Sequence, residues 1–183
     1  MTVLRFVFVA ALLTLPASSQ QNSSQRSVPR SDSIPASCPV TARPARPFIP
    51  PPEYRLRELP EDLFLIGTNE LFTAINEPMI WYWRPQSSGV ILTQKVFWYR
   101  QDYNWRQEPI PNLKVTGKRI DGPAPPLMLP YGRPTHAIMG PDLGAMLTGV
   151  YVPVPGCWEI TGDYRGDKLS FVVWVEPAKS AGS

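Results

Sequence analysis

Residues 156–176 read GCWEITGDYRGDKLSFVVWVE. Large apolar side chains recur at alternate positions on both sides of the Arg-Gly-Asp turn at 165–167, which places them on one face of each strand. That face carries Trp158, Ile160, Tyr164, Leu169, Phe171, Val173 and Val175. The segment therefore predicts a β-hairpin with strands over 156–164 and 168–176, and it places Cys157 on the face opposite Trp158.

Five further segments are rich in β-branched and aromatic residues and are bounded by Pro, Gly, Asn or Asp. They are 70–75, 79–84, 90–100, 112–120 and 144–152. With the hairpin they give seven short strands, which predict an all-β antiparallel sandwich over residues 54–177. The segment 61–66 fits either one helical turn or a short strand. The stretches 121–126 and 130–141 are predicted to be long connections, the kind of segment that can carry a site.

The composition excludes two other classes. Proline accounts for 23 of the 183 residues and glycine for 12. Because a proline inside an α-helix costs about 3 kcal/mol, this density excludes a helical bundle. A hydrophobic content of 43% is sufficient to build one core, so it excludes a chain that is disordered throughout.

The N-terminus predicts export. A single basic residue, Arg5, precedes an apolar run over 6–15, and Pro-Ala-Ser-Ser follows at 16–19. This is the pattern of a signal peptide over 1–19, and the secreted or periplasmic space is then the expected location. A transmembrane anchor is the alternative, but the apolar run is well short of the roughly 20 residues that a membrane-spanning helix needs.

The segments beside the predicted sandwich are less regular. Residues 20–37 are polar and predict a disordered linker, residues 38–53 predict a proline-rich extended arm, and residues 178–183 predict a flexible tail. The two cysteines, Cys38 and Cys157, are expected to form a disulfide in an oxidising compartment, which would tether the arm. Two free thiols are the alternative.

Several motifs carry a resemblance to a known group of proteins. They are Cys-Pro-Val-Thr at 38–41, Trp-Tyr-Arg at 98–100, GKRIDGPAPPL at 117–127 and GCWEITG at 156–162. They resemble a group of small uncharacterised secreted bacterial proteins that carry Cys-Pro-Val-Thr, G-R-R-L-D-G-P-A-P-P-L and G-C-W-E, from which Lys118 and Ile120 depart conservatively. The resemblance implies an immunoglobulin-like fold and an envelope or extracellular address, and it implies no activity.

The sequence holds little that indicates catalysis. His136 is the single histidine, so a nucleophilic triad would need it together with a serine and a carboxylate such as Asp121 or Asp142. No metal site or cofactor is expected, because the acidic residues match no known ligand spacing. A hydrolase that acts on envelope material through loop carboxylates or His136 is kept as the alternative function.

Aromatic residues are concentrated over 81–105, where arginine and lysine lie among them. Core packing accounts for part of this cluster, and strand alternation turns the rest outward. The candidate ligand-binding residues are Tyr82, Tyr99, Arg100, Tyr103 and Trp105. We therefore expect an exported binding or structural module that contacts glycan, cell-wall material or another envelope protein. Removal of Arg5 with the leader lowers the formal net charge from +3 to +2. Nucleic acid is not an expected partner, because so small a positive charge attracts phosphate groups only weakly.

Overall fold

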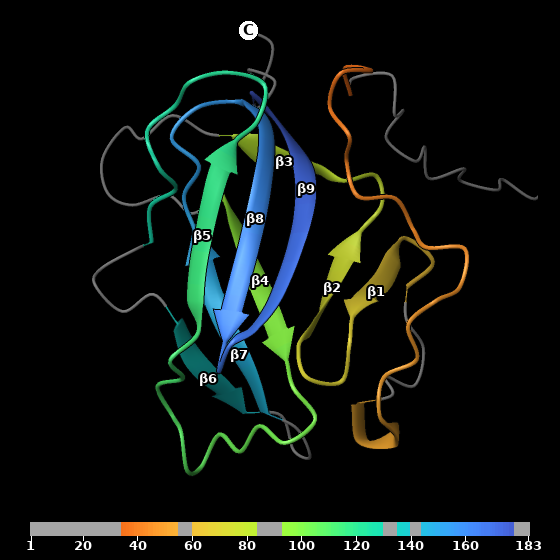
Figure 1. Ribbon diagram of the computed structural model, residues 1–183, viewed down its shortest axis with the longest axis vertical. Helices are drawn as coiled ribbons and strands as arrows, with labels where there is room; N and C mark the ends of the chain where they lie inside the picture. Colours follow the sequence, from red (N-terminus) through yellow and green to blue (C-terminus); the bar gives the residue numbers. More distant parts are fainter. Residues whose placement is uncertain (1–33, 55–59, 84–92, 130–134, 140–143, 178–183) are drawn as a thin grey trace, which may run out of the picture.

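A computed structural model describes residues 34–54, 60–83, 93–129, 135–139 and 144–177. These residues form two packed β-sheets and one short 3-10 helix, η2 (Pro52–Tyr54) (Figure 1). The strands are β1 (Leu63–Gly67), β2 (Phe72–Asn76), β3 (Ile80–Trp83), β4 (Gln94–Tyr99), β5 (Lys114–Arg119), β6 (Thr135–Met139), β7 (Gly144–Val150), β8 (Gly156–Tyr164) and β9 (Asp167–Pro177). The predicted all-β sandwich is confirmed. The predicted leader 1–19 and tail 178–183 lie outside the described residues.

The strand order is immunoglobulin-like. One sheet has the order β1-β2-β4-β7-β6 and the other has the order β3-β9-β8-β5. If β2 and β4 to β9 are lettered A to G in chain order, the sheets contain A-B-E-D and C-F-G, which is the order of a constant-type domain. β1 extends the first sheet, and β3 pairs in parallel with β9 in the second.

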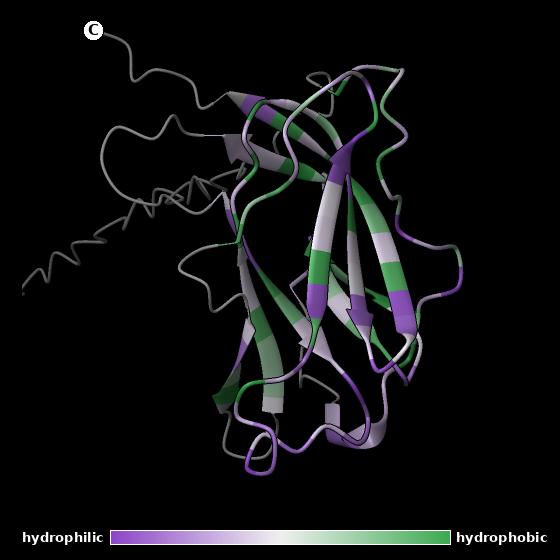
Figure 2. Cartoon of the chain, turned by 60° about the vertical axis from the view of Figure 1, so that its left-hand side comes forward, coloured by the Kyte–Doolittle hydropathy of each residue, from purple (hydrophilic) through white to green (hydrophobic). Residues whose placement is uncertain are grey.

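The hairpin of β8 and β9 forms as predicted. Its register runs from the pair Gly156 and Val175 to the pair Tyr164 and Asp167. The two turn residues, Arg165 and Gly166, have φ values of 56° and 92°, and positive φ at both central positions is the requirement of a type I′ turn. The alternation of apolar and polar residues along the strands is visible in Figure 2. Of the seven side chains predicted to face the core, six are buried, and Leu169 packs against them half-buried.

Two strands were not assigned from the sequence. β1 resolves the ambiguity over 61–66 in favour of a strand. β6 corrects the prediction that 130–141 is a connection, because Thr135–Met139 pairs with β7 through five residue pairs. The five residues of β6 lie between prolines and are too few to show a clear alternation of apolar and polar side chains. The position of β6 in the sheet depends instead on tertiary contacts. The buried Thr135 hydroxyl lies 3.0 Å from Thr148 Oγ1 and donates to the Leu113 carbonyl at 3.3 Å.

The arm is fixed along the sandwich. The predicted disulfide between Cys38 and Cys157 is present, with a Cα–Cα separation of 5.6 Å. Thr41 then exchanges two hydrogen bonds with Val172 of β9, at 2.9 and 2.8 Å. Arg43 bonds to Glu77 at 3.0 Å, which ties the arm to the residue that follows β2. The arm therefore bonds to β9 at Val172, beyond the part of β9 that pairs with β3, and it delivers η2 to the far end of the molecule (Figure 1).

Candidate binding site

The disulfide end of the sandwich gathers three of the resemblance motifs into one closed junction. Arg119 at the end of β5 donates to Asp121 Oδ1 at 2.6 Å, and the Ile120 amide donates to the Cys157 carbonyl at 2.8 Å. Burial opposes ionisation of Asp121, but hydrogen bonds from Arg119 and from the Cys157 amide outweigh it, and the pKa of Asp121 lies below its ordinary value. These motif residues therefore hold the chain together around the disulfide.

Gly156 shows how tightly this junction is closed. Its φ is 143°, and a Cβ on it would lie 2.9 Å from both Asp121 Oδ1 and Arg119 Cζ. Only glycine allows the Arg119 side chain to lie against the backbone at this point. The glycine that opens the G-C-W-E motif thus has a structural explanation.

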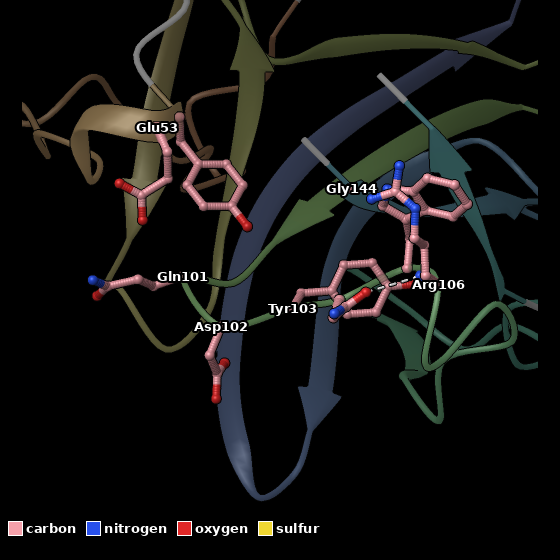
Figure 3. Close-up of a pocket in the computed structure, with 9 residues that line it drawn as sticks. Glu53, Gln101, Asp102, Tyr103, Arg106 and Gly144 are labelled. Atoms are coloured by element: carbon pink, nitrogen blue, oxygen red, sulfur yellow. Dashed lines mark hydrogen bonds between the residues drawn. The ribbon is translucent and has the colours of Figure 1, made fainter. Parts of the chain in front are cut away.

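The opposite end carries an open depression of about 340 Å³, which we call the end depression (Figure 3). It lies between η2, the connection from β4 to β5 and the start of β7. It is lined by Glu53, Tyr54, Gln101, Asp102, Tyr103, Asn104, Trp105, Arg106 and Gly144. Figure 3 shows Glu53, Gln101 and Asp102 on one side and Arg106 on the other, with Tyr103 between them.

The structure brings four of the five sequence-predicted residues to this end and separates the fifth. Tyr103 and Trp105 line the depression, and Tyr99 and Arg100 immediately precede the lining segment. Arg100 bonds to Asp167 at the start of β9, whereas Tyr82 pairs with Glu176 at the end of β9. Nine residues of strand place these two points about 30 Å apart. Tyr82, which is 44% exposed, therefore cannot belong to the same site.

Arg100 supports the depression from beneath. Its guanidinium lies 2.5 Å from both Asp102 and Asp167 and donates to the Glu70 carbonyl at 3.0 Å. The Tyr54 hydroxyl donates to the Arg100 carbonyl at 2.5 Å, and burial, aided by the charges of Glu53 and Asp102, raises the pKa of Tyr54 to about 12. The Arg100 guanidinium thus holds Asp102, Asp167 and the Glu70 carbonyl in place. The Asp102 side chain nevertheless stays 62% exposed.

Glu108 anchors the other end of the lining segment. Its carboxylate accepts hydrogen bonds from Tyr164 at 2.5 Å, Arg165 at 2.9 Å and the Asn112 amide at 3.0 Å, and its carbonyl accepts one from Tyr103 at 2.8 Å. Burial opposes ionisation of this carboxyl, but the donors outweigh it and lower its pKa. The segment 101–106 is consequently held at both ends by the β8–β9 hairpin.

Trp105 is held in place by its neighbours. The Arg106 guanidinium carbon lies 4.4 Å above the centre of the Trp105 ring. A Cβ on Gly144 would lie 2.8 Å from Trp105 Cδ1, so the glycine gives the indole its room. The half-buried ring therefore meets the depression in a fixed orientation.

Sequence reasoning missed seven of the nine residues that line the site, among them Glu53, Tyr54, Asp102 and Arg106. Asp102 and Arg106 lie inside or beside the aromatic cluster and could have been included with it. Glu53 and Tyr54 follow a run of three prolines, and no local signal shows that the tethered arm returns to this end.

The residues proposed for catalysis are not gathered in the described part of the chain. Asp121 is bound to Arg119 at the disulfide end, and His136 is exposed on β6 opposite Leu147 of β7. Asp142 lies outside the described residues. Among the lining residues that the structure describes, the end depression has no histidine, serine or cysteine.

Within the described ranges, no group of three or more His, Cys, Asp or Glu side chains is arranged to hold a metal ion. Over the same ranges, no helix has the length and apolar character that crossing a membrane requires. No protein-family model, curated protein or solved structure matches the chain.

Proposed function

We propose that this chain is an exported binding module and that its end depression holds a saccharide of the cell envelope. The observation that carries the proposal is the half-buried Trp105 ring beside exposed carboxylate, amide and guanidinium groups, at a depression whose wall is completed by the buried Tyr54 and Tyr103. Sugar rings present flat apolar faces edged by hydroxyl groups. Aromatic side chains complement the faces, and planar polar side chains complement the hydroxyls.

The rigidity of the depression supports the same conclusion. Tyr54, Tyr103 and Trp105 are each fixed by a hydrogen bond or by ring packing. Binding of a ligand would therefore not be opposed by the loss of entropy that ordering these side chains would otherwise cause. The disulfide and the leader-like sequence support a secreted or periplasmic setting, in which envelope material is the abundant ligand.

The test is retention of the purified secreted protein on columns of cell-wall polysaccharide. We expect Trp105→Ala to weaken binding about tenfold, or ~1.4 kcal/mol, because it removes the aromatic contact. The matched control is Tyr82→Ala, which removes an exposed aromatic ring at the other end of the sandwich and should leave binding unchanged. Equal losses in both variants, or no retention of the native protein on any wall fraction, would refute the proposal.

Export has a separate test. Mass spectrometry of the secreted protein should show a chain that begins near Gln20 and contains no alkylatable thiol. Retention of residues 1–19 in the mature protein would contradict the proposed location.

A further inference from the structure

A second candidate site lies between β2 and β4. These two strands pair through only two residue pairs, Phe72 with Tyr99 and Thr73 with Trp98. Each of the two strands pairs more fully with its other neighbour. β1 and β2 form five residue pairs, and β4 and β7 also form five. Beyond Thr73 the β1–β2 hairpin therefore diverges from the rest of its sheet.

The divergence leaves a groove of about 430 Å³, which we call the sheet groove. Its floor is formed by the buried core residues Ile75, Trp81, Val96 and Phe171. Its rim is formed by Leu63, Ala74, Asn76, Ile80, Gln94, Lys95, Phe97 and Tyr99. Phe97, which is 38% exposed, is an outward-facing apolar side chain at the rim. An apolar floor with a few polar groups at one side is typical of small-ligand sites.

Two main-chain groups beside the groove, the Phe97 carbonyl and the Lys95 amide, already have side-chain partners. Thr73 Oγ1 donates to the Phe97 carbonyl at 2.7 Å, and the Lys95 amide donates to the Gln94 side-chain oxygen at 3.0 Å. A partner strand would have to replace these bonds, whereas a hydrocarbon chain needs none. The groove therefore favours an apolar chain over an added β-strand.

The charged and polar residues of the groove indicate which polar group an apolar ligand would carry. Among the described residues that line it, Lys95 is the one charged residue. Gln94 and Lys95 offer donors at the rim for oxygen atoms, whereas the Asn76 side-chain amide already donates to Asp62 Oδ2 at 3.3 Å. We propose that the sheet groove binds a single-chain amphiphile with an anionic head group, with the carboxylate or phosphate at Lys95 and the hydrocarbon tail over Ile75 and Val96.

The test is calorimetric titration of the full secreted protein below the critical micelle concentration. The probes are octanoate, decanoate, dodecanoate, dodecyl phosphate and dodecyltrimethylammonium. We expect the anionic probes to bind saturably, with one molecule bound per protein. The dissociation constant should fall by about fourfold for each methylene group that the groove covers. A stronger response to dodecyl phosphate than to dodecanoate would assign the head group as phosphate, and the reverse would assign it as carboxylate.

Two variants locate the ligand. Ala74→Trp fills the groove and should abolish binding, while Thr116→Trp places the same ring on the exposed surface of β5 and should not. Lys95→Glu should weaken dodecanoate binding about tenfold and spare the cationic probe. Equal affinity for anionic and cationic probes, unchanged binding in Ala74→Trp, or no binding by any probe would overturn the proposal. The two sites share no lining residue, so saccharide binding can fail or succeed independently.

Discussion

The two ends of the sandwich carry the same three-residue pattern and use it differently. Arg-Ile-Asp at 119–121 begins with the last residue of β5, and Arg-Gln-Asp at 100–102 directly follows β4. In both, the arginine Nε binds the aspartate two residues later, at 2.6 Å in the first and 2.5 Å in the second. The aspartate side chain is 23% exposed at the disulfide end and 62% exposed at the depression. The same ion pair thus closes one end and leaves a carboxylate available at the other.

Their surroundings account for the difference. At the disulfide end the pair lies against Gly156 and accepts a bond from the Cys157 amide, so its polar atoms are used within the chain. At the depression end, Arg100 takes Asp167 as a second partner, and the connection from β4 to β5 bends away from the strands. We infer that the closed end maintains the fold and that the open end meets the ligand.

The largest expected effect is at the closed end. Replacing both cysteines with alanine removes a cross-link between residues 119 positions apart. We expect the free energy of unfolding to fall by about 4 kcal/mol, because the denatured chain loses its constraint. Urea unfolding followed by tryptophan fluorescence measures the change. A loss below about 1 kcal/mol would contradict the prediction that the arm unfolds together with the sandwich as one cooperative unit.

Gly156→Ala should have the next largest effect, about 2–3 kcal/mol, because it combines positive φ with a clash. Gly166→Ala is the matched control. Its φ of 92° is also positive, but nothing lies within 4 Å of the added Cβ. We expect a loss of about 1 kcal/mol for the control in the same unfolding experiment. Equal losses would show that Arg119 does not occupy the position next to Gly156.

Glu108→Gln tests the anchor of the open end. We expect a loss of about 1–2 kcal/mol at pH 7, because the charge that Tyr164 and Arg165 bind is removed. The folded-state pKa of Glu108 is lowered, so its stabilisation is present above the unfolded pKa of about 4.3 and is lost as the pH falls below it. The native protein and the variant should therefore converge in stability at acidic pH. A difference that persists there would contradict the charge-based explanation.

The smallest effects distinguish the two aspartates. Asp121→Asn should lower the free energy of unfolding by about 1 kcal/mol, because its side chain is only 23% exposed and its carboxylate accepts several hydrogen bonds. Asp102→Asn should cost less than about 0.5 kcal/mol, because its ion pair is largely exposed. It should nevertheless weaken saccharide binding. The reverse order of stability would remove the distinction between the two ends.

The hairpin and the sandwich were predictable because their signal is local. Large apolar side chains at alternate positions between Trp158 and Val175 indicate which face is buried, and two cysteines allow one intramolecular pairing. Strand β6 was not predictable in the same way, because five residues between prolines carry too little periodicity. Its place in the sheet depends on β7 and on the contact of Thr135 with Thr148.

The end depression was predictable only in part. The aromatic cluster pointed to Tyr103 and Trp105, but sequence proximity also drew in Tyr82, which the strand directions send to the other end. Glu53 and Tyr54 reach the site because the tethered arm runs the length of the sandwich, a path that no short segment encodes. Three of the four resemblance motifs, in turn, meet at the closed junction around the disulfide, whereas Trp-Tyr-Arg at 98–100 lies at the depression end.

Hydrogen–deuterium exchange with and without a purified wall saccharide tests the division between the ends most directly. The account predicts slower exchange over 52–54 and 100–108 on binding, with 117–121 and 156–158 unchanged. Protection confined to 117–121 and 156–158 would contradict it.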